Sequence, residues 1–216
     1  MLVGGRVASA VTKGRKGGLP ASANAIFAEP GHPPSGGECS MPSASWQSDE
    51  GLNFCPRCAG PLVPREIERR MRPRCERCGF IWYQDPKVAA GTLPVMDDGS
   101  LVLVRRAIQP QRGCWTYPGG FMDRGETAPG AAVRETREEC LLEVEPTGLL
   151  GVYSYATSIT VVVVYAARVT GGTLAAGPEC LEARAFAVSE LPWEDLAFSS
   201  TRDVLNDYLR REGGAP

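Results

Sequence analysis

Apolar residues recur in short runs separated by turn residues over the part of the chain that follows Lys87. Runs rich in Val, Ile and Leu and bounded by Gly, Pro or Asp predict β-strands. The continuous apolar run Val161–Val164 predicts a strand that is buried on both faces. The sequence Asp97-Asp98-Gly99 predicts a hairpin between the first two strands. The predicted strands span residues 87–95, 101–105, 115–117, 149–155, 159–169 and 183–188.

Two segments predict helices instead. Residues 127–142 predict a helix with Thr127 as its N-cap and Pro129 in its first turn. Residues 200–210 predict a last helix. Strands that surround one early helix and are followed by another indicate a mixed α/β layer fold.

Residues 1–50 differ from the rest, because they are rich in Gly, Ala, Ser and Pro and show no sustained periodicity. Such a segment cannot bury enough apolar surface to offset its ordering entropy, so we expect a disordered N-terminal tail. The tail has no acidic residue before Glu29 and contains four basic ones, which is also the bias of an organellar targeting peptide. Met41 is a natural alternative start. We expect a cytoplasmic protein, with targeting by residues 1–40 left open.

Length and charge narrow the function classes. The chain has 216 residues, enough for one domain of about 150 residues and a smaller part. Its formal net charge of −2 excludes a protein held to nucleic acid by bulk positive charge, although a local basic patch remains open. No apolar run reaches the roughly 18 residues of a membrane span. The one histidine, His32, lies in the tail, so histidine catalysis is not expected in the folded part.

Four of the eight cysteines form two Cys-x-x-Cys pairs within residues 53–83. This spacing is typical of a four-thiolate zinc site. A closed shell of four cysteines leaves no open position for water, so we expect a structural zinc ribbon. The predicted ligands are Cys55, Cys58, Cys75 and Cys78.

The same segment is rich in arginine, with seven arginines against three glutamates and thus a local charge of +4. Such a surface is either simply solvated or contacts substrate or nucleic acid. The arginines are Arg57, Arg65, Arg69, Arg70, Arg72, Arg74 and Arg77.

Three glutamates share one face of the helix predicted over residues 127–142. Glu135, Glu138 and Glu139 stand at positions i, i+3 and i+4. Their mutual repulsion destabilises a bare helix, and a hard divalent cation with oxygen ligands offsets it. Mg²⁺, or Mn²⁺, suits because it binds a few carboxylates and keeps positions for water and phosphate. The carbonyl of Gly120, in a preceding glycine turn, is a further candidate ligand.

These residues are those of the Nudix box, and the chain resembles Nudix hydrolases. Glu126 and Arg134 are expected to pair and to hold the loop against the helix. Two positions depart from the family pattern: Thr136 replaces an apolar residue, and Leu141 replaces a glycine that would end the helix in a left-handed turn. Neither departure removes a ligand. The matching residues are Gly120, Glu126, Arg134, Glu135, Glu138, Glu139 and Leu142.

The resemblance covers about residues 53–210. The ribbon and the motifs Tyr83–Lys87 and Pro118–Gly120 are similar to zinc-ribbon Nudix proteins. Gly177–Glu182 and Leu196–Ser200 are similar to the plant type that hydrolyses FAD and ADP-ribose. The Ser-Gln-Pro-Trp-Pro-Phe-Pro signature of the NADH diphosphatases is missing, so NADH is less favoured than FAD or ADP-ribose as the primary substrate.

The resemblance implies an α+β fold, an α/β/α sandwich with a mixed sheet over residues 86–212, after the ribbon over residues 53–83. It also implies Mg²⁺-dependent hydrolysis of the pyrophosphate in a nucleoside diphosphate linked to another moiety, FAD or ADP-ribose first, with release of AMP. The alternatives are an NADH diphosphatase, an RNA-cap hydrolase, a zinc-ribbon nucleic-acid-binding protein and a catalytically silent ligand sensor. A homodimer is compatible with the family.

The resemblance leaves the general base open between Glu135, a box residue, and Glu179 or Glu182, which lie in a later segment. Contacts with substrate are assigned from residue type alone. Arginines near the box can bind phosphate, and an aromatic ring can stack on a nucleotide base. These candidates are Arg105, Arg106 and Tyr153.

Overall fold

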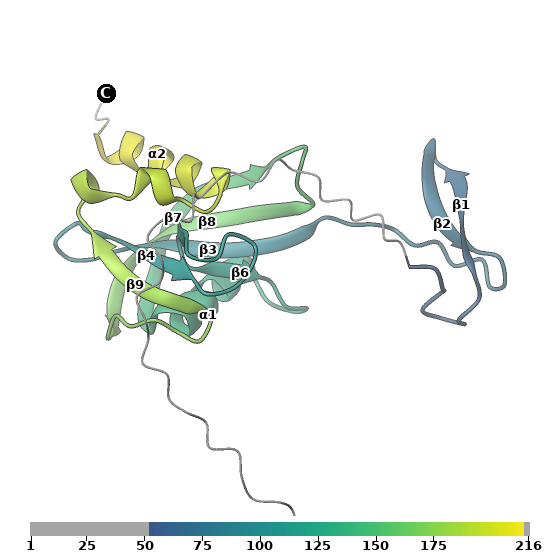
Figure 1. Ribbon diagram of the computed structural model, residues 1–216, viewed down its shortest axis with the longest axis horizontal. Coiled ribbons are helices and arrows are strands. Elements are labelled where there is room, and N and C mark those ends of the chain that lie inside the picture. The colour runs from purple at the N-terminus through teal and green to yellow at the C-terminus, as the bar shows by residue number, and fades with distance from the viewer. Residues whose placement is uncertain (1–51, 214–216) are drawn as a thin grey trace, which may run out of the picture. The chain divides into compact units, whose positions relative to one another are not determined.

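The computed structural model describes residues 52–213, so the expectations for residues 1–50 lie outside the described residues. A two-stranded sheet comes first and a seven-stranded sheet with two α-helices follows (Figure 1). The first sheet contains β1 (Leu62–Ile67) and β2 (Arg70–Cys75). The second contains β3 (Lys87–Val95), β4 (Leu101–Arg106), β5 (Trp115–Thr116), β6 (Gly119–Phe121), β7 (Leu142–Ser154), β8 (Thr160–Gly172) and β9 (Cys180–Phe186). The helices are α1 (Ala128–Cys140) and α2 (Ser199–Gly213), with short 3₁₀ turns at Val188–Glu190 and Trp193–Asp195.

The larger sheet is mixed, as expected. Its central path runs β5-β4-β3-β8-β7, with β6 paired to β3 and β9 to β4. β3 and β8 run parallel, and the other neighbours are antiparallel. The predicted hairpin between β3 and β4 is present, and its turn is closed by the Met96 amide donating to the carbonyl of Ser100.

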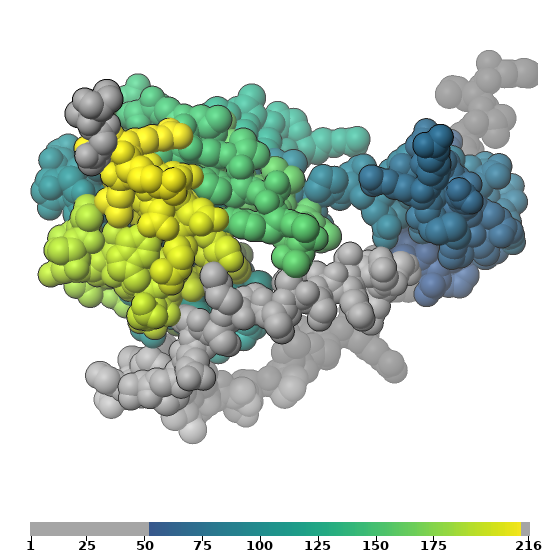
Figure 2. Space-filling model, turned by 90° about the horizontal axis from the view of Figure 1, so that it is seen from above, coloured from purple at the N-terminus to yellow at the C-terminus, as the bar shows by residue number. Residues whose placement is uncertain are grey.

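One helix covers each face of this sheet, which confirms the α/β/α sandwich (Figure 1). On one face, Ala131 and Ala132 of α1 pack against Ala90 of β3. On the other face, Val204 and Leu205 of α2 join a core with buried residues of several strands. Figure 2 shows α2 lying over that second face, beside the green strands of the sheet. Burying apolar side chains on both faces is what stabilises such a three-layer arrangement.

Helix α1 begins at the predicted N-cap but ends at Cys140, two residues before the predicted end at residue 142. The Thr127 side chain accepts a hydrogen bond from the Gly130 amide at 3.2 Å, and Pro129 lies in the first turn. The helix ends at Cys140, and Leu141 adopts the left-handed conformation with φ of 57°. The turn that a glycine normally makes is therefore formed here by leucine, and α1 keeps its length.

The strands differ from the sequence analysis in several places. β6 was not predicted, β8 ends at Gly172 and not at residue 169, and β9 spans Cys180–Phe186 and not residues 183–188. β7 begins at Leu142, not at residue 149, because the chain turns directly from α1 into a pairing with β8 that starts at Leu142 and Gly172. The run Val161–Val164 was expected to be buried on both faces, yet Val161–Val163 are only half-buried and Val164 alone is buried. On the α2 face, the first part of β8 extends beyond the end of α2 (Figure 1).

In the smaller sheet, β1 and β2 form an antiparallel hairpin that pairs Leu62 with Cys75 and Ile67 with Arg70. Glu68 and Arg69 make its turn, and both have positive φ. Within residues 52–213, no helix is both long and apolar enough to cross a membrane.

Candidate active site

The box glutamates differ in exposure although they share one helix face. Glu139 is buried, with 9% of its surface exposed, and its Oε2 accepts a hydrogen bond from the Gly119 amide at 2.9 Å. Burial raises the pKa of Glu139 to about 7, and the Gly119 amide opposes that rise. Burial also raises the pKa of Glu135, whereas the Glu138 side chain is 57% exposed. The site therefore offers two shielded carboxylates beside one that faces water.

Gly120 lies directly against the carboxyl group of Glu135. A Cβ atom built on Gly120 would be 2.6 Å from the Glu135 Cδ, so no larger residue fits without displacing this carboxylate. β6 therefore contacts α1 through its backbone. The Gly119 amide donates to Glu139, and the backbone of Gly120 packs against Glu135. This explains why the box needs a glycine here.

Arg134 links the loop before α1 to the box carboxylates. Its guanidinium donates to both carboxylate oxygens of Glu126, at 2.7 and 3.0 Å. It also donates to Glu135 at 2.7 Å and to Glu138 at 3.1 Å. The hydrogen bonds from Arg134 lower the pKa of Glu126 to about 2. The expected pairing of Glu126 and Arg134 is therefore present, and it extends to two further carboxylates.

The loop before β9 contacts the C-terminal end of α1 through its backbone. The Gly177 amide donates to the carbonyl of Glu139 at 2.8 Å. A Cβ atom on Gly177 would overlap the carbonyl oxygen of Glu138, so only glycine allows the loop to approach α1 this closely. The same loop positions Glu179, whose negative charge raises the pKa of both Glu135 and Glu139. Glu179 thus lies within electrostatic range of the box.

The two arginines at the end of β4 lie in different surroundings. Arg105 donates through Nε to the carbonyl of Gly113. Arg106 donates to the carbonyl of Pro110 at 2.8 Å, and its guanidinium lies 5.2 Å from the centre of the Phe198 ring. Burial lowers the pKa of Arg106, while the charge of Glu139 opposes this effect. Arg106 therefore interacts electrostatically with Glu139 of the box.

Two other candidates lie on the α2 side of the sheet. Tyr153 is buried there, and its hydroxyl donates to Asp207 of α2 at 2.9 Å. Glu182 is paired with Arg105 in the sheet and stands four residues before Phe186 on β9, so it shares the face of Phe186, which belongs to the core under α2. The structure therefore does not gather these two side chains with the box glutamates, which project from α1 on the opposite face.

The donor set on α1 fits a hard divalent cation, because carboxylate and carbonyl oxygens are the preferred ligands of Mg²⁺. Among the residues that the structure describes, however, the four cysteines of the ribbon are the only group of three or more residues whose metal-ligating atoms all lie within 4.8 Å of one another. Arg134 accounts for the difference, since its guanidinium bridges Glu135 and Glu138. A cation would therefore compete with Arg134 for these carboxylates.

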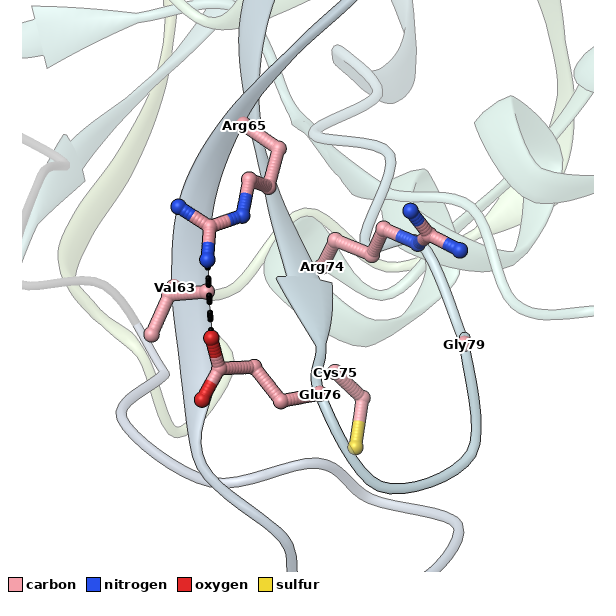
Figure 3. Close-up of a pocket in the computed structure, with 6 residues that line it drawn as sticks. All are labelled: Val63, Arg65, Arg74, Cys75, Glu76 and Gly79. Carbon is pink, nitrogen blue, oxygen red and sulfur yellow. Dashed lines mark hydrogen bonds and ion pairs between the residues drawn. The ribbon is translucent and has the colours of Figure 1, made fainter.

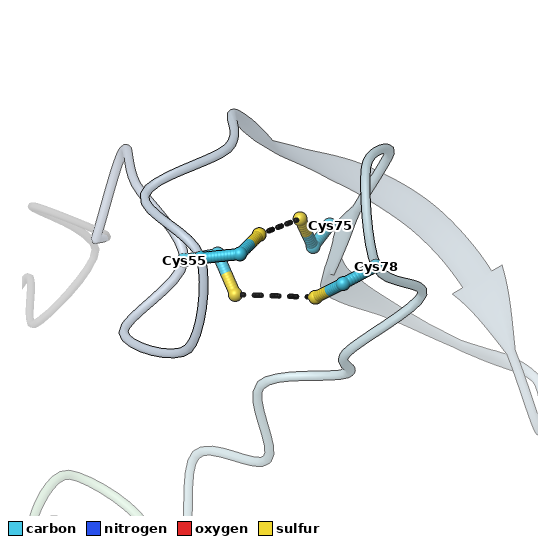
Figure 4. Close-up of side chains that lie close together, drawn as sticks. Cys55, Cys75 and Cys78 are labelled. Carbon is cyan, nitrogen blue, oxygen red and sulfur yellow. Dashed lines mark hydrogen bonds between the residues drawn. The ribbon is translucent and has the colours of Figure 1, made fainter.

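The four Sγ atoms of the cysteine cluster all lie within 4.8 Å of one another (Figure 4). The Sγ atoms of Cys55 and Cys78 are 3.7 Å apart, and those of Cys58 and Cys75 are 3.5 Å apart. Four thiolates around zinc at 2.3 Å would be about 3.8 Å apart. The pairs predicted from spacing thus converge on one point, and their sulfur atoms fit zinc.

Sequence reasoning did not single out Gly177 as a contact of α1, nor the Gly119 amide as the hydrogen-bond partner of Glu139. It also assigned Thr136 no partner, although its buried hydroxyl lies 2.6 Å from the hydroxyl of Thr92 on β3. A buried Thr at an otherwise apolar helix position is a signal of such a partner, because buried hydroxyl groups are nearly always hydrogen-bonded. The Gly177 contact joins segments far apart in the chain and left no comparable signal.

Comparison with known proteins identifies the family of this chain. The family model of the NUDIX domain matches residues 85–208. An ADP-ribose pyrophosphatase from Methanocaldococcus jannaschii is 36% identical over 136 residues, which are 61% of this chain and 78% of that protein. An NAD-capped RNA hydrolase, NudC, from Pseudomonas putida is 28% identical over 164 residues, which are 76% of this chain and 58% of that protein. The chain thus spans less than two thirds of the NudC relative.

A solved structure agrees over most of the chain. The NUDIX hydrolase from Nitrosomonas europaea superposes with a TM-score of 0.72 at 38% identity, and the match covers 76% of this chain and 95% of the other. The matched family region includes the glutamate helix, its preceding glycine turn and the loop that holds Glu179. The chain belongs to the Nudix family.

Proposed function

We propose that this chain hydrolyses the pyrophosphate bond of a nucleoside diphosphate linked to another moiety and releases AMP. The observation that carries the proposal is the set of box carboxylates on α1, held in place by Arg134 and by the Gly119 amide. Membership of the Nudix family supports a divalent-metal-dependent hydrolase, and the relative from Methanocaldococcus jannaschii is an ADP-ribose pyrophosphatase by name.

In this proposal Glu135, Glu138 and Glu139, with the carbonyl of Gly120, would hold Mg²⁺ or Mn²⁺. Such a cation neutralises phosphate charge and activates water for attack on phosphorus. Arg134 keeps the carboxylates in place before the cation binds, because it already donates to Glu135 and Glu138. Burial of Glu139 against the Gly119 amide fixes its orientation.

We assign the general base to Glu179 ahead of Glu135 and Glu182. Its charge reaches both Glu135 and Glu139, and its loop is fixed to α1 through Gly177. Glu179 would accept the proton of the attacking water. Arg106 would bind a substrate phosphate, because its half-buried guanidinium carries a positive charge beside these carboxylates.

ADP-ribose and FAD are the substrates we place first. Hydrolysis would give AMP with ribose phosphate from ADP-ribose, or AMP with FMN from FAD. The NudC relatives favour a second candidate, hydrolysis of NAD-capped RNA or of NADH, because their similarity extends over 76% of this chain.

The decisive experiment incubates the full-length protein and Mg²⁺ with ADP-ribose, FAD, NADH and NAD-capped RNA in separate reactions, with product analysis by chromatography. Glu138→Gln should abolish release of AMP. Glu143→Gln, which removes one carboxylate from an exposed position on β7, is the matched control and should keep full turnover. Turnover of none of the four substrates, or equal turnover by Glu138→Gln, would refute the proposal.

The cysteine cluster supports a further part of the proposal, a structural zinc ion in the ribbon. The paired Cys-x-x-Cys spacing is typical of metal binding in a reducing compartment, so we place the protein in the cytoplasm. A homodimer, which the family resemblance suggests, is tested by the molar mass in solution.

A further inference from the structure

The β1–β2 hairpin concentrates arginines on one of its faces. In β2, arginine stands at every second position, and side chains two apart on a strand share a face. The register places Arg72 opposite Arg65, so Arg65 of β1 lies on this face too. We call the four residues Arg65, Arg70, Arg72 and Arg74 the arginine face.

This arrangement costs stability unless an anion compensates it, because like charges directly opposite on two strands repel. Two carboxylates compensate part of the charge. Glu76 accepts from Arg65 at 2.8 Å, and Glu68 accepts from Arg72 at 2.9 Å. Within residues 52–213, Arg70 and Arg74 have no ion-pair or hydrogen-bonding partner, so their charges remain available to a ligand.

The face is also hollowed. A cavity of about 300 Å³ is lined by Arg65, Arg74 and Glu76, among others (Figure 3). Figure 3 shows Arg65 turned toward Glu76, while Arg74 extends away from it beside Gly79. The cavity therefore has one arginine held by a carboxylate and one that is free to bind an anion.

An aromatic ring lies next to these charges. The guanidinium of Arg72 lies 5.0 Å from the centre of the Tyr83 ring, and Tyr83 is 48% exposed. Guanidinium groups bind phosphate, and an exposed aromatic ring stacks on a nucleic-acid base. Arginines beside such a ring are the combination that binds the backbone and the bases of single strands.

We propose that the arginine face, together with Tyr83, binds single-stranded nucleic acid. The phosphodiester backbone would contact Arg70 and Arg74, and one base would stack on Tyr83. The net charge of −2 makes this a local property of the ribbon and not of the whole chain. The binding does not depend on the proposed hydrolysis, so either can fail alone.

The test measures anisotropy of a labelled, unstructured oligonucleotide of about 12 nucleotides, as RNA and as DNA, with the full-length zinc-loaded protein and no added Mg²⁺. Arg70→Gln/Arg74→Gln should reduce the salt slope of log K by about 1.4, since each phosphate contact on a single strand contributes about 0.7. Tyr83→Ala should weaken binding at least about fivefold. Zinc content and thermal unfolding of each variant verify that the ribbon is folded.

The matched control is Arg168→Gln/Arg210→Gln, which removes the same charge from two exposed side chains outside the ribbon. It should bind like the unchanged protein. Preference for RNA over DNA would assign the ligand to RNA through its 2′-hydroxyl, and equal binding would assign it to single strands in general. Absence of binding at low salt, equal losses in both double variants, or full binding by Tyr83→Ala would overturn the proposal.

Discussion

At the scale of single residues, the two departures from the box pattern are accommodated in different ways. Thr136 is completely buried and uses its hydroxyl twice, donating to the Ala132 carbonyl at 2.7 Å and contacting the Thr92 hydroxyl at 2.6 Å. Leu141 keeps its side chain 46% exposed and adopts a backbone conformation that suits glycine. The first departure adds a buried polar contact, and the second adds strain.

Replacing Thr136 by Val should lower the free energy of unfolding by about 1–3 kcal/mol, because it leaves the buried Thr92 hydroxyl without a partner. The double variant Thr92→Val/Thr136→Val should recover most of this loss, since neither hydroxyl is then left unpaired. Urea denaturation of the four proteins measures the cycle. Losses that simply add in the double variant would show that the two hydroxyl groups are not coupled.

Replacing Leu141 by Gly should raise the stability by about 1 kcal/mol, because glycine adopts φ of 57° without a clash of its own Cβ atom. For a domain of this size, such a gain raises the melting temperature by about 2–4 °C in calorimetry. Leu141→Ala is the control, since alanine retains the Cβ atom and should give no comparable gain. An equal rise for both variants would mean that the exposed leucine side chain, and not the backbone, is the cause.

At the scale of elements, α1 is held by three segments: the loop before it through Glu126, β6 through Gly119, and the loop before β9 through Gly177. The last contact is backbone against backbone, so it positions the end of the helix and the Glu179 loop together. Rigid placement of catalytic groups to well under 1 Å is worth a large factor in rate.

Gly177→Ala should therefore reduce kcat by about 10²-fold, because the new Cβ atom would overlap the Glu138 carbonyl oxygen and push the loop away from α1. Steady-state kinetics with ADP-ribose measure the effect. Gly148→Ala is the matched control, since its Cβ atom would have no neighbour within 4 Å. An unchanged kcat in Gly177→Ala would show that the contact between Gly177 and α1 has no part in catalysis.

At the scale of the molecule, the two sheets are stabilised in different ways. The larger sheet buries apolar clusters on both faces, whose members all lie between residues 90 and 209. In the ribbon, the fully buried apolar side chains among the described residues are those of Cys55 and Cys75. A module with so few buried apolar side chains depends on its bound metal for folding, as small zinc modules do.

Chelation of zinc should therefore unfold the ribbon and leave the catalytic sheet folded. We expect one zinc per chain by elemental analysis and four additional fast-reacting thiols after chelation. Calorimetry should show the main transition little changed, because no ribbon residue belongs to the apolar clusters. A fully cooperative loss of both parts on chelation would contradict this separation.

The sequence by itself determined the features that depend on local periodicity and spacing. The three glutamates fall on one face because a helix has 3.6 residues per turn, and its N-cap and glycine turn are read directly from the residues around Thr127 and Gly120. The cysteine spacing likewise specifies a four-thiolate cluster before any fold is known.

The tertiary structure alone decided what depends on contacts between distant segments. It buried Glu139 against the Gly119 amide and brought Gly177 into contact with α1. It also placed Tyr153 on the opposite side of the sheet from the glutamates. It also showed that the arginines of the ribbon share one face, because this depends on the register of β1 against β2. Burial and register arise from the packing of the whole chain, and no local pattern encodes them.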